Sequence, residues 1–250
     1  MKSLKNWFLV LSVLSCFGCS SPVHEDGRGC AFVSDSIQYR VEFMSEGCVR
    51  ILSFPEGDTL VTKRLVVDSQ KPAFKDYKWK DTGQQLIFST RELSVAFDKE
   101  DAAFTFQEVS TGKLLLKEKE AKKARHFKRS VTGGEQCLEV TQRFVPTDDE
   151  AIYGLGQYQN GIMNYRGKSV LLLQANMDIV NPFLISTNGY GILWDNYSST
   201  KFEDTKEGYS FTSEVGDASD YYFVYGKNMD EVVAGYRELT GDVPMFGKWV

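Results

Sequence analysis

The feature that most constrains the fold is a series of short segments in which apolar and polar residues alternate. Such alternation with a period of two is typical of strands that bury one face of a sheet. Turn residues such as PEGD at 55–58 and STGK at 110–113 separate these segments. The strand-like segments are 36–43, 48–54, 85–89, 93–98, 103–108 and 137–145. Many short strands joined by turns predict a mainly β chain that folds as an antiparallel β-sandwich, rather than a parallel α/β sheet.

One helix is predicted, near the C-terminal end of the printed sequence. Asn228 is the expected N-cap, with Glu231 as its reciprocal capping partner, and Gly241 stands where a C-cap glycine belongs. The apolar residues expected on its buried face are Val232, Val233, Tyr236 and Leu239. The apolar residues 245–250 that follow have the pattern of a strand that is beginning.

The first residues of the chain are predicted to be an export signal rather than part of the fold. Lys2 and Lys5 precede an apolar run at 7–14, which is too short to span a bilayer but suits the core of a signal peptide. A plain secretory signal with incidental cysteines is the alternative to a lipoprotein signal.

A cysteine that follows a small residue after such a run resembles the bacterial lipoprotein processing site. We therefore expect a lipoprotein signal peptide at 1–19, lipidation of Cys19, and a flexible tether at 20–33, with Cys16 as the competing lipidation site. The protein is then an exported periplasmic, outer-membrane or cell-surface lipoprotein that meets the membrane through its lipid anchor only.

The charges argue against nucleic acid as a partner. The net charge is −5, whereas nucleic-acid binders concentrate Lys and Arg on one face. The densest basic run, 117–129, also contains glutamates, so we interpret it as a solvated linker between strands.

The cysteines and histidines give no support to a metal site, and no cofactor is expected. Cys30, Cys48 and Cys137 remain after the signal, with no C-x-x-C pair, and His24 and His126 are the chain's two histidines. One disulfide is compatible with an exported protein, but the sequence does not assign its pairing.

Motifs of nucleophilic and nucleotide chemistry are absent from the sequence. No G-x-S-x-G motif is present, and the glycines at 154 and 156 lack the third glycine of a dinucleotide fingerprint, so we expect a backbone bend there. Asp195 is the most tempting carboxylate, but its place at a strand end favours a turn-forming role.

Amide side chains are concentrated between 157 and 181, among segments that look buried. Amides donate and accept hydrogen bonds as sugar hydroxyls do, and they carry no ionisation penalty. The amides and the acid among them are Gln157, Gln159, Asn160, Asn164, Gln174, Asn176, Asp178 and Asn181. Nearby aromatics offer flat surfaces for a sugar ring, and ordinary loop polarity remains the alternative.

Three segments together resemble the N-terminal domain of family-31 glycoside hydrolases. They are FVP through YGLGQ at 144–157, NPFLIS through GYGILWDN at 181–196, and the closing helix with Pro244 and Trp249. Weaker similarity extends the match to about 34–250. The QYQNG and NYRGK details are most similar to the α-xylosidase-like branch, which acts on plant cell-wall glycans.

The resemblance implies a β-sandwich of the galactose mutarotase type packed against a (β/α)8 barrel. Its members hydrolyse α-glycosidic bonds with retention, using two aspartates on the barrel. We expect the sandwich at 34–227 and, at 228–250, a linker helix and the first strand of a truncated barrel. No catalytic residue is therefore assigned, and this chain alone is expected to be inactive.

In this family a loop of the N-terminal domain helps to shape the substrate pocket, and here it would fall within 157–178. The expected substrate-binding residues are Gln157, Asn160, Asn176 and Asp178. The expected function is substrate shaping in an α-xylosidase or α-glucosidase that breaks down plant or dietary glycans, with the oligosaccharide shared with the barrel. Two alternatives stay open, a free-standing carbohydrate-binding lipoprotein without hydrolase activity and an inactive structural remnant.

Overall fold

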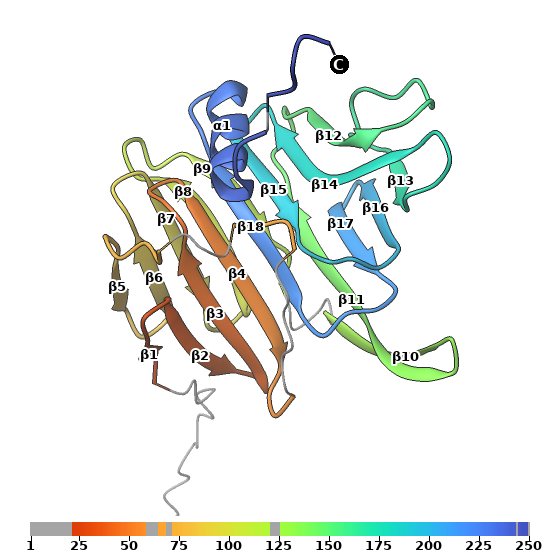
Figure 1. The fold of residues 1–250 in the computed structure, drawn as a ribbon. Coiled ribbons are helices and arrows are strands. Elements are labelled where there is room, and N and C mark those ends of the chain that lie inside the picture. The colour runs from red at the N-terminus through yellow and green to blue at the C-terminus, as the bar shows by residue number, and fades with distance from the viewer. Residues whose placement is uncertain (1–21, 59–64, 69–71, 121–125, 244, 250) are drawn as a thin grey trace, which may run out of the picture.

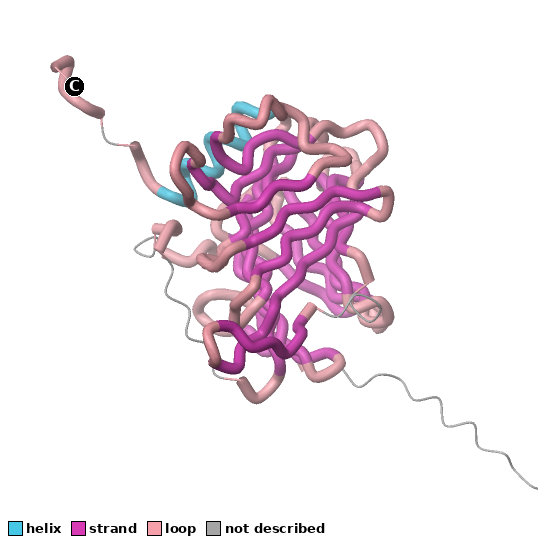
Figure 2. The backbone as a smooth tube through the Cα atoms, turned by 90° about the vertical axis from the view of Figure 1, so that its right-hand side faces the viewer, coloured by secondary structure: helices cyan, strands magenta, loops and turns pink. Residues whose placement is uncertain are grey.

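The computed structural model describes residues 22–58, 65–68, 72–120, 126–243 and 245–249. Two antiparallel sheets pack face to face, and the helix α1 (Met229–Thr240) lies on the outer face of one of them (Figure 1). Figure 2 shows the two layers of strands from the side. The predicted antiparallel β-sandwich with one helix near the C-terminal end is confirmed.

The first sheet has eight strands, and every neighbouring pair is antiparallel. In spatial order these are β1 (His24–Glu25), β2 (Cys30–Ser34), β3 (Ile37–Phe43), β4 (Cys48–Pro55), β18 (Ser219–Tyr225), β15 (Tyr190–Trp194), β14 (Ile179–Ser186) and β12 (Ile152–Gln157). The N-terminal strands thus lie beside the last strand of the sandwich, so the fold depends on contacts between distant parts of the chain.

The second sheet has ten strands and is also antiparallel. Nine follow one path, and β10 (Phe127–Thr132) pairs with β11 as a projecting hairpin. The path is β13 (Ser169–Leu172), β16 (Thr200–Thr205), β17 (Gly208–Ser213), β11 (Glu135–Val145), β9 (Leu114–Glu118), β8 (Ala103–Glu108), β7 (Leu93–Asp98), β6 (Gln85–Ser89) and β5 (Lys78–Asp81).

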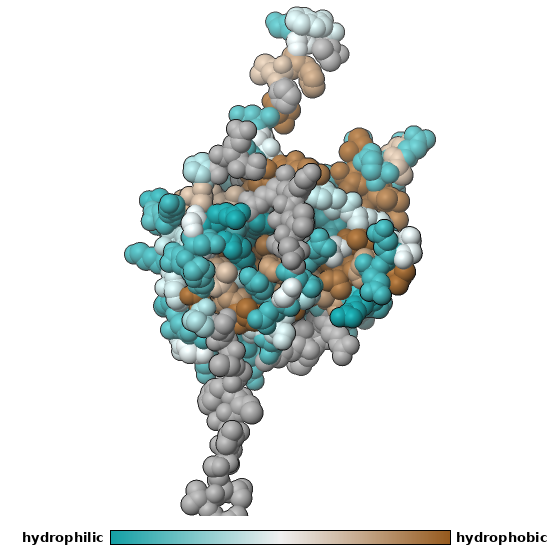
Figure 3. Space-filling model, turned by 60° about the horizontal axis from the view of Figure 1, so that its bottom comes forward, coloured by the Kyte–Doolittle hydropathy of each residue, from teal (hydrophilic) through white to brown (hydrophobic). Residues whose placement is uncertain are grey.

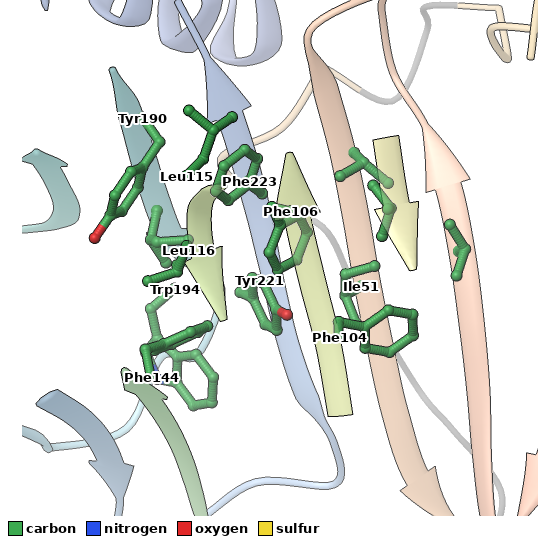
Figure 4. Packing of buried hydrophobic residues seen from close by; sticks show 14 of the residues in the cluster. Ile51, Phe104, Phe106, Leu115, Leu116, Phe144, Tyr190, Trp194, Tyr221 and Phe223 are labelled. Carbon is green, nitrogen blue, oxygen red and sulfur yellow. The ribbon is translucent and has the colours of Figure 1, made fainter. Parts of the chain in front are cut away.

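Aromatic side chains fill the space between the two sheets. Phe106 of β8 and Phe223 of β18 stack with ring centroids 4.2 Å apart, and Phe144 meets Tyr221 edge-on at 5.2 Å (Figure 4). Burial of such large apolar surfaces is the main favourable contribution to folding. The alternating pattern of the sequence therefore becomes one continuous aromatic core.

Helix α1 lies close against the eight-stranded sheet. Tyr236 stacks on Phe183 of β14 at 4.2 Å, and Val232 and Leu239 are buried. A Cβ atom on Gly191 of β15 would lie 2.8 Å from the Val232 side chain, so a glycine at this position lets the helix approach.

The helix ends agree with the sequence in most details. Asn228 Oδ1 accepts the Glu231 N–H at 2.9 Å, and the Gly241 N–H donates to the Arg237 carbonyl at 2.9 Å. The Glu231 carboxylate accepts from the backbone of Lys227 at 3.0 Å rather than from that of Asn228. Val233, predicted on the buried face, is 41% exposed.

The sandwich begins earlier than the sequence predicted. Strand β1 and all but the last residue of β2 lie within the expected tether at 20–33, and Cys30 and Phe32 are buried. Phe32 stacks on Tyr39 of β3 at 5.4 Å, which anchors β2 in the core. The tether prediction is therefore wrong from His24 onward, because Cys30 and Phe32 gain burial when β2 pairs with β3.

Other expectations need correction as well. No strand forms at 245–249, where Met245 and Trp249 are 98% and 90% exposed, because these residues have no neighbouring strand. The basic run 117–129 is only partly a linker, since its ends belong to β9 and β10 and its centre, 121–125, lies outside the described residues.

The predictions for the N-terminus lie outside the described residues, both the signal peptide at 1–19 and lipidation at Cys19. Across the part of the chain that the structure describes, no helix has the length and apolar character to cross a membrane. Cys30, Cys48 and Cys137 are free thiols, so none of them forms the disulfide that the sequence left open.

Candidate functional site

The GLG segment puts a bulge in β12 directly before the first candidate residue. Gly154, Leu155 and Gly156 have φ angles of 100°, 66° and 119°, and the pairing with β14 shifts register between the two glycines. A Cβ on Gly156 would lie 2.0 Å from the carbonyl oxygen of Ile179, which only glycine avoids. The predicted backbone bend is confirmed, and it sets the direction in which Gln157 leaves the sheet.

The loop between β12 and β13 is anchored along its second half. Arg166 Nε donates to Asp204 Oδ2 at 2.8 Å, and Arg166 NH1 donates to the Glu150 carbonyl at 3.1 Å. Asn164 Oδ1 accepts the Ile152 N–H at 3.1 Å, and Tyr165 is buried. These contacts give the first half of the loop, 158–163, a fixed base from which to project.

Asn160 lies in that projecting half. Its side-chain oxygen accepts the Ile162 N–H at 2.9 Å, which makes a local turn, and the residue is exposed. Met163 on the same segment is 79% exposed. The segment therefore presents an amide and an apolar side chain to solvent on a structured loop.

Asn176 and Asp178 lie on the turn that leads into β14. Gln174 brackets this turn, because its Nε2 donates to the Asp178 carbonyl at 2.8 Å and its Oε1 accepts the Val180 N–H at 3.1 Å. Met177, between the two candidates, has a φ of 71°. Gln174 thus supplies hydrogen bonds of the kind that a neighbouring strand would make.

The structure brings the four predicted binding residues to one corner of the sandwich. Gln157 pairs with Ile179, the residue after Asp178, so Gln157 and the Asn176–Asp178 turn share one end of the β12–β14 ladder. Asn160 is on the adjoining loop, and both loops project on the same side in Figure 1. We call Gln157, Asn160, Asn176 and Asp178 the amide face.

Apolar side chains surround the amide face. Leu171, Met177 and Ile179 are 52%, 63% and 55% exposed, in addition to Met163. Figure 3 shows apolar surface gathered on the right of the molecule, the side on which β12 and β13 lie in Figure 1. Exposed apolar patches rimmed by polar groups are typical of binding surfaces.

A pocket of about 340 Å³ adjoins this corner. It forms because β15 pairs with β14 only from Phe183 onward, which leaves the first half of β14 without a neighbour on that side. Pro182, which has no N–H, suits such an unpaired edge. Lining residues come from β13, β14 and the segment 194–200, and we call this recess the β15 pocket.

Asp195 lies in the wall of the β15 pocket. The sequence suggested a turn-forming aspartate, whereas the structure shows a hydrogen bond between its carboxylate and the Tyr197 hydroxyl. Burial, followed by the contact with Asp195, raises the pKa of Tyr197 to about 12. The Tyr197 hydroxyl also accepts the Leu65 N–H at 2.9 Å.

His126, one of the chain's two histidines, contributes to the fold. Its Nδ1 lies 3.1 Å from the Thr141 carbonyl oxygen, and its side chain is buried. Burial lowers the pKa of His126 to about 4, so the ring is neutral at physiological pH.

Sequence reasoning missed two supporting residues, Gln174 and Arg166. Gln174 was one of the noted amides, but nothing in its spacing shows that it replaces strand hydrogen bonds. Arg166 stands next to the candidate amides, and its partner Asp204 is separated from it by 38 residues. Neither contact has a local sequence signal.

A family model described as the glycosyl hydrolase 31 N-terminal galactose mutarotase-like domain matches residues 38–203. An α-xylosidase of Saccharolobus solfataricus is 34% identical over 229 residues, which are 86% of this chain and 30% of that protein. An isomaltosyltransferase of Sporosarcina globispora is 23% identical over 84% of this chain and 20% of its own length. The chain thus spans less than a third of either relative.

Solved structures agree with the fold. A GH31 α-xylosidase of Xanthomonas citri superposes with a TM-score of 0.80 at 21% identity, over 91% of this chain and 41% of its own. A GH31 dextranase of Flavobacterium johnsoniae gives a TM-score of 0.75 at 22% identity, over 93% of this chain and 29% of its own. At these identities the likeness concerns the fold alone.

Proposed function

This chain belongs to glycoside hydrolase family 31 through its N-terminal galactose mutarotase-like domain, and we propose that it is the substrate-shaping domain of a retaining α-glycosidase. The observation that carries the proposal is the amide face, where Gln157 at the end of β12 and the other three residues on the adjoining loops lie at one end of the β12–β14 ladder. Hydroxyl-rich ligands need groups that both donate and accept hydrogen bonds, which amides provide.

Pre-organisation of these loops supports a binding role. The bulge at Gly156, the Gln174 bracket and the Arg166 contacts hold the two loops before any ligand arrives. A surface that is already ordered loses less conformational entropy when it binds. The amide face is therefore suited to orient a sugar rather than to close around it.

The amide face does not by itself supply the chemistry of hydrolysis. Retaining glycosidases use two carboxyl groups about 5–5.5 Å apart. Asp178 is the one carboxylate among the four residues of the face. We propose that both catalytic carboxylates come from a catalytic domain outside these residues, with which this domain shares the oligosaccharide.

The proposed substrates are α-xylosidic or α-glucosidic oligosaccharides from plant or dietary glycans. The similarity to proteins named α-xylosidase and α-glucosidase supports this choice. Export as a lipoprotein anchored through Cys19 belongs to the same proposal and is supported by the N-terminal sequence pattern. A free-standing carbohydrate-binding lipoprotein is the alternative, and the same amide face would serve it.

The test compares hydrolysis of an aryl α-xyloside and an aryl α-glucoside by two proteins. One is this chain alone, and the other is this chain joined to the catalytic domain of the X. citri α-xylosidase or to the rest of its own reading frame. We expect turnover only by the joined protein. Turnover by this chain alone would contradict the proposal. If both proteins bind the glycosides and neither hydrolyses them, the result would support the alternative of a free-standing carbohydrate-binding lipoprotein.

A further inference from the structure

We propose that the β15 pocket binds a single neutral sugar unit. The pocket lies between the end of β15, the strand β13 and the half of β14 that does not pair with β15. It opens to solvent and has a volume of about 340 Å³. Small-ligand pockets usually measure about 300–1,000 Å³, so this one suits a small molecule rather than a long chain segment. The inference does not depend on the amide face.

The charges of the described lining argue against anionic ligands and a metal ion. Among the described residues the lining contains no Lys, Arg or His, whereas phosphate and carboxylate ligands are normally held by cationic side chains. Asp195 is its one carboxylate, and within the described residues no group of three or more His, Cys, Asp or Glu side chains could hold a metal ion. A neutral ligand is therefore favoured.

The lining also has an apolar part and a polar part, which a sugar ring requires. Leu172, Pro182 and Leu193 contribute apolar surface, and Asp195 and Ser199 contribute hydrogen-bonding groups. A pyranose has apolar C–H faces and a rim of hydroxyls, so each side of the pocket has a counterpart on the ligand. A purely apolar ligand would leave the polar half of the lining without a hydrogen-bonding partner.

Tyr197 provides the flat surface at the mouth of the pocket. The residue is 56% exposed, and its hydroxyl is fixed by Asp195 and by the Leu65 N–H. An aromatic ring whose position is fixed in this way can stack on a sugar without further loss of freedom. The Asp195 carboxylate has two oxygens and can accept additional hydrogen bonds from ligand hydroxyls.

The experiment is a titration of the ¹⁵N-labelled 250-residue chain with D-xylose, D-glucose and glucose 6-phosphate, followed by amide NMR. We expect saturable shifts for residues 195–199 and 172–174 with at least one neutral sugar. Glucose 6-phosphate should bind at least ten-fold more weakly than glucose, because the described lining of the pocket holds a carboxylate and no cation.

Variants connect the shifts to the pocket. Tyr197→Ala should weaken binding at least ten-fold and Asp195→Asn several-fold, whereas Val131→Ala, an exposed change on the distant β10 hairpin, should leave it unchanged. Dispersed amide spectra of each variant show whether it folds, and Asp195→Asn keeps the shape of the side chain if Tyr197→Ala does not fold.

Each of the other possible patterns of NMR shifts would either support or overturn the pocket proposal. Saturable shifts confined to 157–160 and 176–178 would overturn the pocket proposal while supporting the amide face. Shifts that never saturate, or that survive both pocket variants, would show non-specific association and also overturn it. Shifts at 195–199 with none at the amide face would support the pocket while removing support from the proposed function.

Discussion

The hydroxyl of Tyr221 donates a hydrogen bond of 2.6 Å to the carboxylate of Glu118, and this contact joins the two sheets through the core. Gln142 Nε2 and the Phe104 N–H also donate to the same carboxylate, each at 2.8 Å. Glu118 is 3% exposed, and burial raises its pKa to about 7 despite these hydrogen bonds.

This contact predicts a pH dependence of stability. The pKa of Glu118 is higher in the folded chain than its ordinary 4.5, so the folded state binds the proton more tightly. Stability from this group is present below about pH 4.5 and is lost as the pH rises to about 7, by an amount on the order of 3 kcal/mol. Because the pKa of His126 is lowered to about 4, that group gains stability over the same window, so urea unfolding measures the Glu118 loss as the difference between this chain and Glu118→Gln.

Glu118→Gln should remove most of that dependence, because glutamine does not ionise. Glu135→Gln, at the exposed start of β11, is the matched control and should leave the dependence intact. An unchanged pH profile in Glu118→Gln would show that another group is responsible.

Gly156→Ala should destabilise the fold by about 3 kcal/mol, since the new Cβ would meet the Ile179 carbonyl in addition to the strain of its φ. Gly161→Ala is the matched control, because its φ is also positive, at 70°, but open space surrounds it. We expect about 1 kcal/mol there. Thermal unfolding measures both, and equal losses would contradict the steric argument.

Arg166→Ala should release the loop that carries Asn160. The change removes the 2.8 Å contact with Asp204 and the bonds to the Thr147 and Glu150 carbonyls, at a cost of about 2 kcal/mol for this partly exposed group. Hydrogen exchange at 158–167 should accelerate more than elsewhere.

The control for this prediction is Arg129→Ala, an exposed arginine on β10. It should not change the exchange of the loop. If Arg166→Ala lowers global stability while the loop amides keep their protection, then other contacts hold the loop.

Asn160→Ala and Asn176→Ala should each lower kcat/KM of the protein joined to its catalytic domain about ten-fold, which corresponds to about 1.4 kcal/mol of lost transition-state binding. Gln136→Ala removes an exposed amide from the β10–β11 hairpin and serves as the control. Steady-state kinetics with an aryl α-xyloside would show the difference. Equal values for all three variants would remove the amide face from the site.

Local patterns predicted much of the fold. The period-two alternation predicted β3, β4, β6, β7, β8 and β11, Asn228 and Gly241 predicted the ends of α1, and the GLG segment predicted the bend in β12. These features depend on backbone conformation and on burial of one strand face, which neighbouring residues decide. The similarity of 144–157 and 181–196 to the glycoside hydrolase family was likewise visible in contiguous residues.

The boundaries of the sandwich and the roles of its polar residues were not visible locally. Glu118 lies in a run that reads as a solvated linker, yet it is buried because Tyr221, 103 residues away, reaches it. Strands β1 and β2 looked like a polar tether, yet they pair at the sheet edge.

The sequence by itself determined the β architecture and the helix near its C-terminal end, because each follows from short-range periodicity and turn chemistry, whereas the pairing of Gln157 with Ile179 brings the amides to one corner. Only the tertiary structure decided that Gln174 brackets the turn of Asn176 and Asp178, and that Asp195 and Tyr197 line a pocket. The pocket exists because β15 pairs with β14 only at residues 183–186, which leaves residues 179–182 of β14 without a partner strand on that side. These contacts span few residues, but they depend on which backbone groups the pairing of β14 with β12 and β15 leaves free, and that register is set by the folded sheets.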